Sequence, residues 1–154
     1  MDIIDELRAI TTTLDREGVA YALCGGLAMA VYAMPRATLD IDLLIQTDSL
    51  PQAIRVLEPL GFSETSDPME FGGGKVLIRR FSKLDPPSTE LLVLDLLLVT
   101  DATTQAWEGR QTVDWEGRKL CVVSPEGLIS LKELRGSGKD RDDIEYLRSI
   151  LDED

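Results

Sequence analysis

The sequence contains no histidine, and this absence removes several classes of chemistry. Imidazole is the general base of Ser-His-Asp hydrolases and a common zinc ligand, so neither kind of site can rest on it here. Any catalysis must instead use carboxylates, lysines and metal ions. Cysteine is scarce as well: Cys24 and Cys121 both lie in apolar stretches, where we expect small buried side chains rather than a disulfide.

Basic residues are also few, with 16 Lys and Arg against 28 Asp and Glu, for a net charge of −12. Phosphate backbones are bound through Lys and Arg, so we expect only weak free-standing affinity for nucleic acid. A small nucleotide held through Mg²⁺ is compatible with this charge. The longest apolar run, Leu91 to Val99, is interrupted by an aspartate, and the acidic N-terminus does not resemble a signal peptide. We therefore expect a cytoplasmic protein with no membrane partner.

Hydrophobic periodicity predicts helices that alternate with strands. This order indicates an α/β (α+β) fold with a mixed β-sheet, flanking helices and a C-terminal helical pair. The 154 residues predict one domain, with a core at about 19–123 and C-terminal helices at 124–154. We expect residues 66–74, which are rich in glycine, to be flexible. The expected helices are 3–18, 25–33, 50–60, 103–108, 125–134 and 140–151, and the expected strands are 20–24, 38–45, 62–65, 76–84, 91–99, 111–115 and 119–123.

The stretch from Leu23 to Ile45 reads LCGGLAMAVYAMPRATLDIDLLI and combines a glycine pair with an acid pair. Side chains alternate along a strand, so Asp40 and Asp42 point to one face. Two carboxylates in an apolar setting repel each other, and a Mg²⁺ ion removes that cost. Backbone N–H groups at a glycine turn that opens a helix favour phosphate, which suits Gly25-Gly26. The alternatives are an exposed acidic edge strand and a purely conformational role for the glycines.

A third carboxylate, Asp95, lies alone in the apolar run LLVLDLLLV. An unpaired buried carboxylate is costly, so a metal ion or a cationic side chain is its expected partner. The alternative to a metal is an aspartate at a sheet edge, paired with Arg79 or Arg80.

Together, Gly25-Gly26 and the Asp-x-Asp strand resemble the signature of the DNA polymerase β-like nucleotidyltransferase superfamily. The segment Arg36-x-Thr38-x-Asp40-Ile41-Asp42 is similar to that of small prokaryotic members, including those linked to toxin–antitoxin systems. The resemblance implies a nucleotidyltransferase-like domain in which a nucleoside monophosphate moves from an NTP, with ATP expected, to a protein or RNA hydroxyl. Pyrophosphate would be released.

The same resemblance assigns roles to the three carboxylates. It implies that Asp40 and Asp42 hold Mg²⁺ and, through it, the triphosphate. Asp95 would complete a site for two metal ions and act as the candidate base. Gly25 and Gly26 would bind the phosphates.

Four further residues are candidate contacts for the nucleotide. If the second strand extends back to Arg36, then Arg36 and Thr38 share a face with the acid pair, where they could contact phosphate. Lys132 and Lys139 match lysines that lie near the phosphates or the acceptor in similar nucleotidyltransferases. The alternatives are a structural ion pair for Arg36 and a solvated helix face for Lys132.

Two other functions compete with this interpretation. One is a catalytically weak nucleotide-binding module that acts through a protein partner, such as a toxin–antitoxin component. The other is a nucleotide-sugar glycosyltransferase, which also uses Asp-x-Asp but typically needs larger donor and acceptor domains than 154 residues provide. The roles of Lys75, Arg79 and Arg80 stay open between a phosphate-contacting flap and a plain hairpin tip.

Overall fold

A mixed eight-stranded β-sheet organises the residues that the computed structural model describes, which are 2–32, 40–84, 90–135 and 138–152. The strand order is β3-β5-β6-β2-β1-β8-β7, and β4 pairs with β5 beside this path. β2 runs parallel to β6 and antiparallel to β1. The strands are β1 Ala22–Cys24, β2 Asp40–Ile45, β3 Ser63–Glu64, β4 Met69–Phe71, β5 Val76–Leu84, β6 Leu91–Leu98, β7 Gln111–Trp115 and β8 Arg118–Val122.

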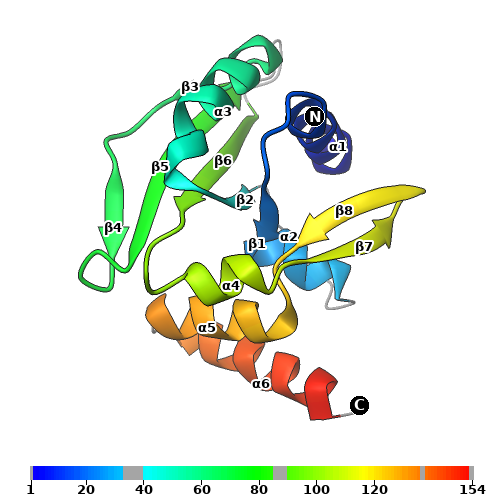
Figure 1. Cartoon of the computed structure of the whole chain (residues 1–154), viewed down its shortest axis with the longest axis vertical. Helices are drawn as coiled ribbons and strands as arrows, with labels where there is room; N and C mark the ends of the chain where they lie inside the picture. Colours follow the sequence, from blue (N-terminus) through cyan, green and yellow to red (C-terminus); the bar gives the residue numbers. More distant parts are fainter. Residues whose placement is uncertain (1, 33–39, 85–89, 136–137, 153–154) are drawn as a thin grey trace.

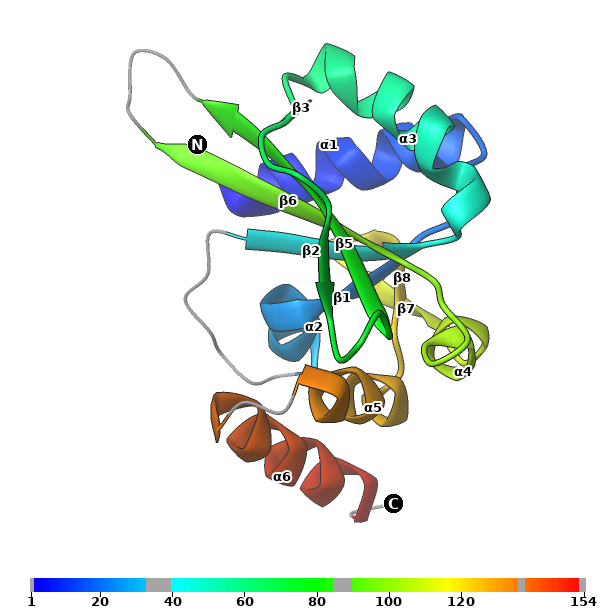
Figure 2. The same ribbon diagram turned by 90° about the vertical axis from the view of Figure 1, so that its left-hand side faces the viewer.

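Helices cover both faces of this sheet (Figures 1 and 2). Figure 2 shows α1 and α3 on one face and α2 and α5 on the other, with α6 outside α5. This arrangement confirms the predicted α/β class, the mixed sheet and the C-terminal helical pair. Within the described ranges, no helix is both long and apolar enough to cross a lipid bilayer. The helices are α1 Ile3–Arg16, α2 Gly25–Val31, α3 Leu50–Leu57, α4 Thr104–Glu108, α5 Pro125–Arg135 and α6 Gly138–Asp152, with short 3₁₀ turns at Thr47–Ser49 and Glu58–Leu60.

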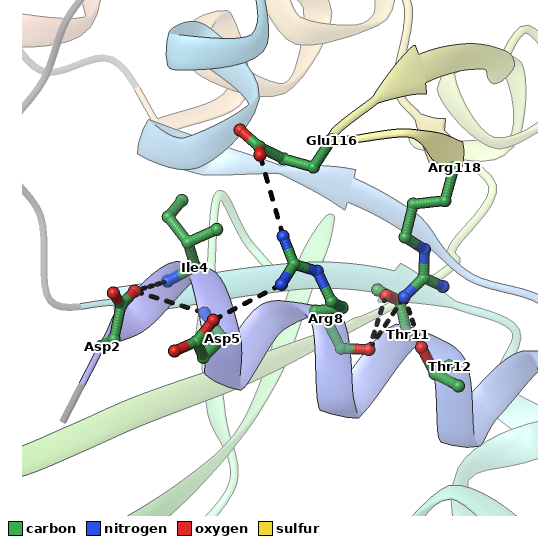
Figure 3. Close-up of polar contacts among 8 residues, drawn as sticks. All are labelled: Asp2, Ile4, Asp5, Arg8, Thr11, Thr12, Glu116 and Arg118. Carbon is green, nitrogen blue, oxygen red and sulfur yellow. Dashed lines mark hydrogen bonds and ion pairs between the residues drawn. The ribbon is translucent and has the colours of Figure 1, made fainter.

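Helix α1 contacts the β7–β8 hairpin at one end of the sheet (Figure 3). Its N-terminus is capped by Asp2, whose Oδ1 accepts a hydrogen bond from the backbone N–H of Ile4 at 2.8 Å. Arg8 forms an ion pair with Glu116 of the hairpin at 3.8 Å, and the Arg8 carbonyl accepts a hydrogen bond from Arg118 at 3.2 Å. Exposed ion pairs stabilise little, so the helix is held mainly by its buried side chains, Leu7, Ile10 and Leu14.

The central strands β2 and β6 present different residues to the two faces of the sheet. Ile41 pairs with Leu94, which pairs in turn with Phe81 of β5, and all three are buried toward α1 and α3. Because side chains alternate along each strand, the next residue on every strand points to the opposite face. One face of these strands therefore builds the core, and the other is available for polar side chains.

Most predicted elements lie within two residues of the observed ones, but the segment 66–74 differs. It was expected to be flexible, whereas Met69–Phe71 forms strand β4, which pairs antiparallel with β5. Three residues are too few to show a period of two, and the adjacent Pro68 and glycines favour a loop interpretation. The segment is therefore a hairpin arm, and residues 72–75 form its turn.

Candidate functional site

A row of polar side chains crosses four strands of the sheet on the face that α2 and α5 cover. Cys24 of β1 pairs with Asp42 of β2, Asp42 pairs with Asp95 of β6, and Asp95 pairs with Arg80 of β5. Asp42 is half-buried and Asp95 is buried. The parallel register of β2 and β6 thus sets Asp42, the second acid of the Asp-x-Asp motif, beside Asp95. A metal site that includes both residues needs this arrangement.

The glycine turn lies directly against Asp42. Gly25 has a φ of +68°, and a Cβ built on it would lie 2.7 Å from Cγ and 2.9 Å from Cβ of Asp42. A side chain at this position would have to displace the carboxylate, and the left-handed backbone would also be strained. The glycine turn and Asp42 therefore form one structural unit in the fold, although residues 27–41 lie between Gly26 and Asp42 in the sequence.

The start of α2 offers backbone donors at the same place. The first N–H groups of a helix have no partner within the helix, and in the part of the chain described here Cys24 does not cap them with a side-chain hydrogen bond. Gly26 is half-buried in this first turn. Because α2 has only seven residues, its dipole adds little, and any anion bound here would rely on the N–H groups themselves.

Arg80 holds the third carboxylate by two hydrogen bonds. Nε and Nη2 of Arg80 each donate to one oxygen of Asp95 at 2.9 Å, and the side chains are 40% and 6% exposed respectively. The pKa of Arg80 is raised, first by these hydrogen bonds and further by the charges of Asp95, Asp40 and Asp42. The ion-pair alternative for Asp95 is thus present, but in a central strand and not at a sheet edge.

A cavity lies over this row, between the sheet and α5. It is open to solvent, and the space of about 650 Å³ between its lining residues includes that open solvent. Its lining includes the charged residues Asp42, Asp95, Arg80 and the buried Lys132 of α5. The lining also includes apolar residues, which are Phe71, Val76, Ile78, Leu97, Leu128 and Leu131. Lys132 is therefore brought to the site and does not belong to a solvated helix face.

The structure says less about the other predicted residues. Asp40 is exposed at the first residue of β2 and shares the face of Asp42. Arg36 and Thr38 lie outside the described residues, and so does the side chain of Lys139 on α6.

Arg80 is a cavity residue whose role the sequence interpretation left open, because it named Arg79 and Arg80 together as possible partners of Asp95. Val76, Ile78 and Arg80 alternate with Arg79 along β5, so the parity of this strand could have separated the two arginines. Arg79 pairs instead with Glu64 on β3. What the sequence does not contain is the register that sets Arg80 opposite Asp95.

The donor set suits Mg²⁺, but the arrangement is not a complete metal centre. Carboxylate oxygens are the ligands that Mg²⁺ prefers, and Asp42 and Asp95 are neighbours on one face. Among the side chains that the structure describes, no three Asp, Glu or Cys groups come together in a way that could hold a metal ion. Both oxygens of Asp95 already accept hydrogen bonds from Arg80.

Comparison with known proteins identifies the fold. No family model and no curated protein sequence matches the chain. Solved structures do match: a nucleotidyltransferase structure from Thermotoga maritima has a TM-score of 0.66 at 17% identity, covering 99% of this chain and 94% of its own. The lincosamide antibiotic adenylyltransferase LnuA has a TM-score of 0.63 at 22% identity, with 95% and 96% covered. The structure of ANT(2'')-Ia in complex with adenylyl-2''-tobramycin has a TM-score of 0.66 at 15% identity, with 96% and 88% covered. The chain thus has a nucleotidyltransferase fold, like these adenylyltransferases.

Proposed function

We propose that this chain is a Mg²⁺-dependent nucleotidyltransferase that transfers a nucleoside monophosphate from an NTP, with ATP as the expected donor, to a hydroxyl group. The observation that carries this proposal is the fit of Gly25 against Asp42, which joins a turn suited to phosphate to a carboxylate suited to metal. The fold shared with two adenylyltransferases supports it. Asp95 and Lys132, which line the same cavity, supply the further charges that a triphosphate site needs.

The roles of the residues follow from their positions. Asp40, Asp42 and Asp95 would hold Mg²⁺, with two ions expected, which would supply neutralisation of charge on the triphosphate and on the leaving pyrophosphate. The backbone N–H groups at Gly25 and Gly26 would bind phosphate oxygens. Lys132, buried in the cavity wall, would add positive charge close to them. Arg36, Thr38 and Lys139 stay proposed phosphate contacts.

The reaction exchanges one bond to phosphorus for another. The acceptor oxygen forms a bond to the α-phosphorus, and the bond from this phosphorus to the bridging oxygen breaks, so pyrophosphate leaves with the electron pair. The proton of the acceptor hydroxyl goes to the carboxylate of Asp95, which is the candidate base. Asp95 is buried and apolar side chains line the same cavity, which limits water at this point and favours transfer over hydrolysis.

The acceptor is proposed from the residues that line the cavity. A protein or an RNA hydroxyl is the acceptor that the sequence interpretation suggests. The apolar residues in the cavity lining support a third class, a small organic molecule with a hydroxyl group and an apolar body. LnuA, which has the same fold, is a lincosamide antibiotic adenylyltransferase whose structure holds lincomycin. Pyrophosphate release with ATP and a panel of small hydroxyl compounds, a Ser/Thr/Tyr peptide pool and a short RNA would separate the three classes.

Replacing Asp42 with asparagine is expected to remove the stabilisation that Mg²⁺ and NTP confer together. A ligand at 100 times its Kd adds about 2.7 kcal/mol to the free energy of unfolding. For a chain of this size that corresponds to a rise in Tm of about 5–11 °C. Thermal unfolding should be followed with each NTP, with and without Mg²⁺, for the wild type and Asp42→Asn. Because the substitution also relieves repulsion between carboxylates, only the increment on adding ligand is compared.

The matched control is Asp114→Asn, which removes the same charge from an exposed side chain on the edge strand β7. It should keep the full Mg²⁺-dependent increment. An increment that survives in Asp42→Asn would place the nucleotide elsewhere and reject the assignment. If no NTP stabilises the wild type, the stand-alone enzyme is rejected, and the alternative becomes a module completed by a protein partner, as in a toxin–antitoxin pair.

A further inference from the structure

Two neighbouring arginines on β5 hold carboxylates on opposite faces of the sheet. Arg79 pairs with Glu64 near the sheet's edge, and its Nη2 donates to Oε1 at 2.8 Å. Arg80 pairs with Asp95 inside the cavity, through two hydrogen bonds of 2.9 Å. The geometries are alike, but only the second pair involves a carboxylate that the proposed function assigns to metal.

The Arg80 guanidinium and a metal ion compete for the same carboxylate. Arg80 donates to both oxygens of Asp95, and although each oxygen keeps a second lone pair, a Mg²⁺ ion bound there would lie beside the guanidinium and repel its positive charge. Asp95 is only 6% exposed, so water cannot solvate its charge well, and a cation is needed beside it when no metal ion is bound. Arg80 supplies that cation within the protein itself.

The guanidinium also has room to change partners. Its side chain is 40% exposed and lines the cavity together with Lys132. Phosphate oxygens and carboxylates present the same paired acceptors to the planar guanidinium group. A triphosphate bound over Asp42 would therefore offer Arg80 a second partner of the same kind.

We propose that Arg80 is a positioning residue with two alternative partners: it holds Asp95 in the absence of metal, and it moves to the phosphates of the nucleotide when Mg²⁺ takes Asp95. This inference rests on the proposed function. It makes metal and nucleotide interdependent, because the metal frees Arg80 for the phosphates and the phosphates keep Arg80 away from Asp95. The protein then has a low affinity for the metal ion alone and a higher affinity for the metal ion and the nucleotide together.

The test measures the affinity for the metal ion and the affinity for the nucleotide separately. In Arg80→Gln, Mn²⁺ alone should bind about tenfold more tightly than in the wild type, because a charge-assisted pair no longer competes. ATP at saturating Mg²⁺ should bind about tenfold more weakly, because its phosphates lose a partner. Mn²⁺ binding is measured by the EPR signal of the free ion, and ATP binding by calorimetry.

Arg79→Gln is the matched control, since it removes the same group from the neighbouring position, and both affinities should stay at wild-type values. Arg80→Lys covers the case in which Arg80→Gln does not fold. One ammonium cannot engage both oxygens of Asp95 as a guanidinium does, so this variant should gain Mn²⁺ affinity to a smaller extent. The free protein of Arg80→Gln should also unfold at a lower temperature, and Mn²⁺ should raise its Tm more than that of the wild type.

The outcomes distinguish this inference from the function on which it rests. If Arg80→Gln binds Mn²⁺ no more tightly than the wild type, or if both affinities fall together, Arg80 has a structural role only and the inference is overturned. If the wild type binds MgATP and Arg80→Gln binds both Mn²⁺ and ATP with wild-type affinity, the inference fails and the function stands. If Mn²⁺ affinity rises but neither protein binds ATP, competition for Asp95 is supported and the nucleotidyltransferase function fails.

Discussion

Gly25→Ala is expected to lose nucleotide binding while it still folds. The added Cβ would lie 2.7 Å from Cγ of Asp42, so the carboxylate must leave its position beside the glycine turn. With Asp42 displaced, the Mg²⁺-dependent stabilisation by ATP should disappear, and turnover should fall by a factor on the order of 10²–10³, the range seen when one preorganised charge-stabilising group is lost. Thermal unfolding with and without MgATP, together with pyrophosphate release, measures both effects.

A second glycine separates the backbone strain of Gly25→Ala from the displacement of Asp42. Gly18 has a φ of +72°, close to the +68° of Gly25, but a Cβ there would meet no atom within 4 Å. Gly18→Ala should therefore lose about 1 kcal/mol of stability from backbone strain and keep its full response to MgATP. Equal loss of the response in both variants would show that the backbone, and not Asp42, is what alanine disturbs.

Leu94→Ala is expected to have the largest effect on stability. Leu94 is fully buried between Ile41 and Phe81 on the face that α1 and α3 cover. Truncating a leucine at such a position lowers the free energy of unfolding by about 2–5 kcal/mol. For a domain of this size the Tm should fall by about 4–20 °C. Urea or thermal unfolding of the free protein measures this loss.

The position of Leu94 also predicts what the variant keeps. Its neighbour Asp95 points to the opposite face, so folded molecules of Leu94→Ala should bind MgATP with near wild-type affinity at a temperature where the variant is native. Leu91→Ala is the comparison, because Leu91 lies on the same strand and is 51% exposed. It should change the free energy of unfolding by less than about 0.5 kcal/mol. A similar loss in both variants would contradict the assignment of the buried face.

The sequence predicts well whatever depends on local patterns. The period of α1, the glycine that closes the α3 segment and the turn at Glu116-Gly117 all lie where their residues indicated, and Gly61 and Gly117 have positive φ values. The acid strand and the Asp95 strand were also located. These signals are read within about ten residues, so they do not depend on knowing which strands pair.

What the sequence leaves open depends on pairing between distant strands. Arg80 becomes a site residue only because β5 joins β6 in a register that sets it opposite Asp95. A shift of one residue would have brought Arg79 to that face instead. The sequence likewise does not show that the β4–β5 hairpin and α5 line one cavity, because Phe71 and Leu131 come to the same cavity only in the fold.

The Arg80–Asp95 pair also bears on how the chain folds. These two residues are 15 positions apart, so they come together as soon as β5 and β6 pair. The pairing of β6 with β2 brings together segments much farther apart in the chain, and such long-range parallel contacts form late. Asp95 is therefore already paired with Arg80 when β6 pairs with β2. The hairpin lowers the cost of burying a charged strand against β2, and a variant without Arg80 should refold more slowly than one without Arg79.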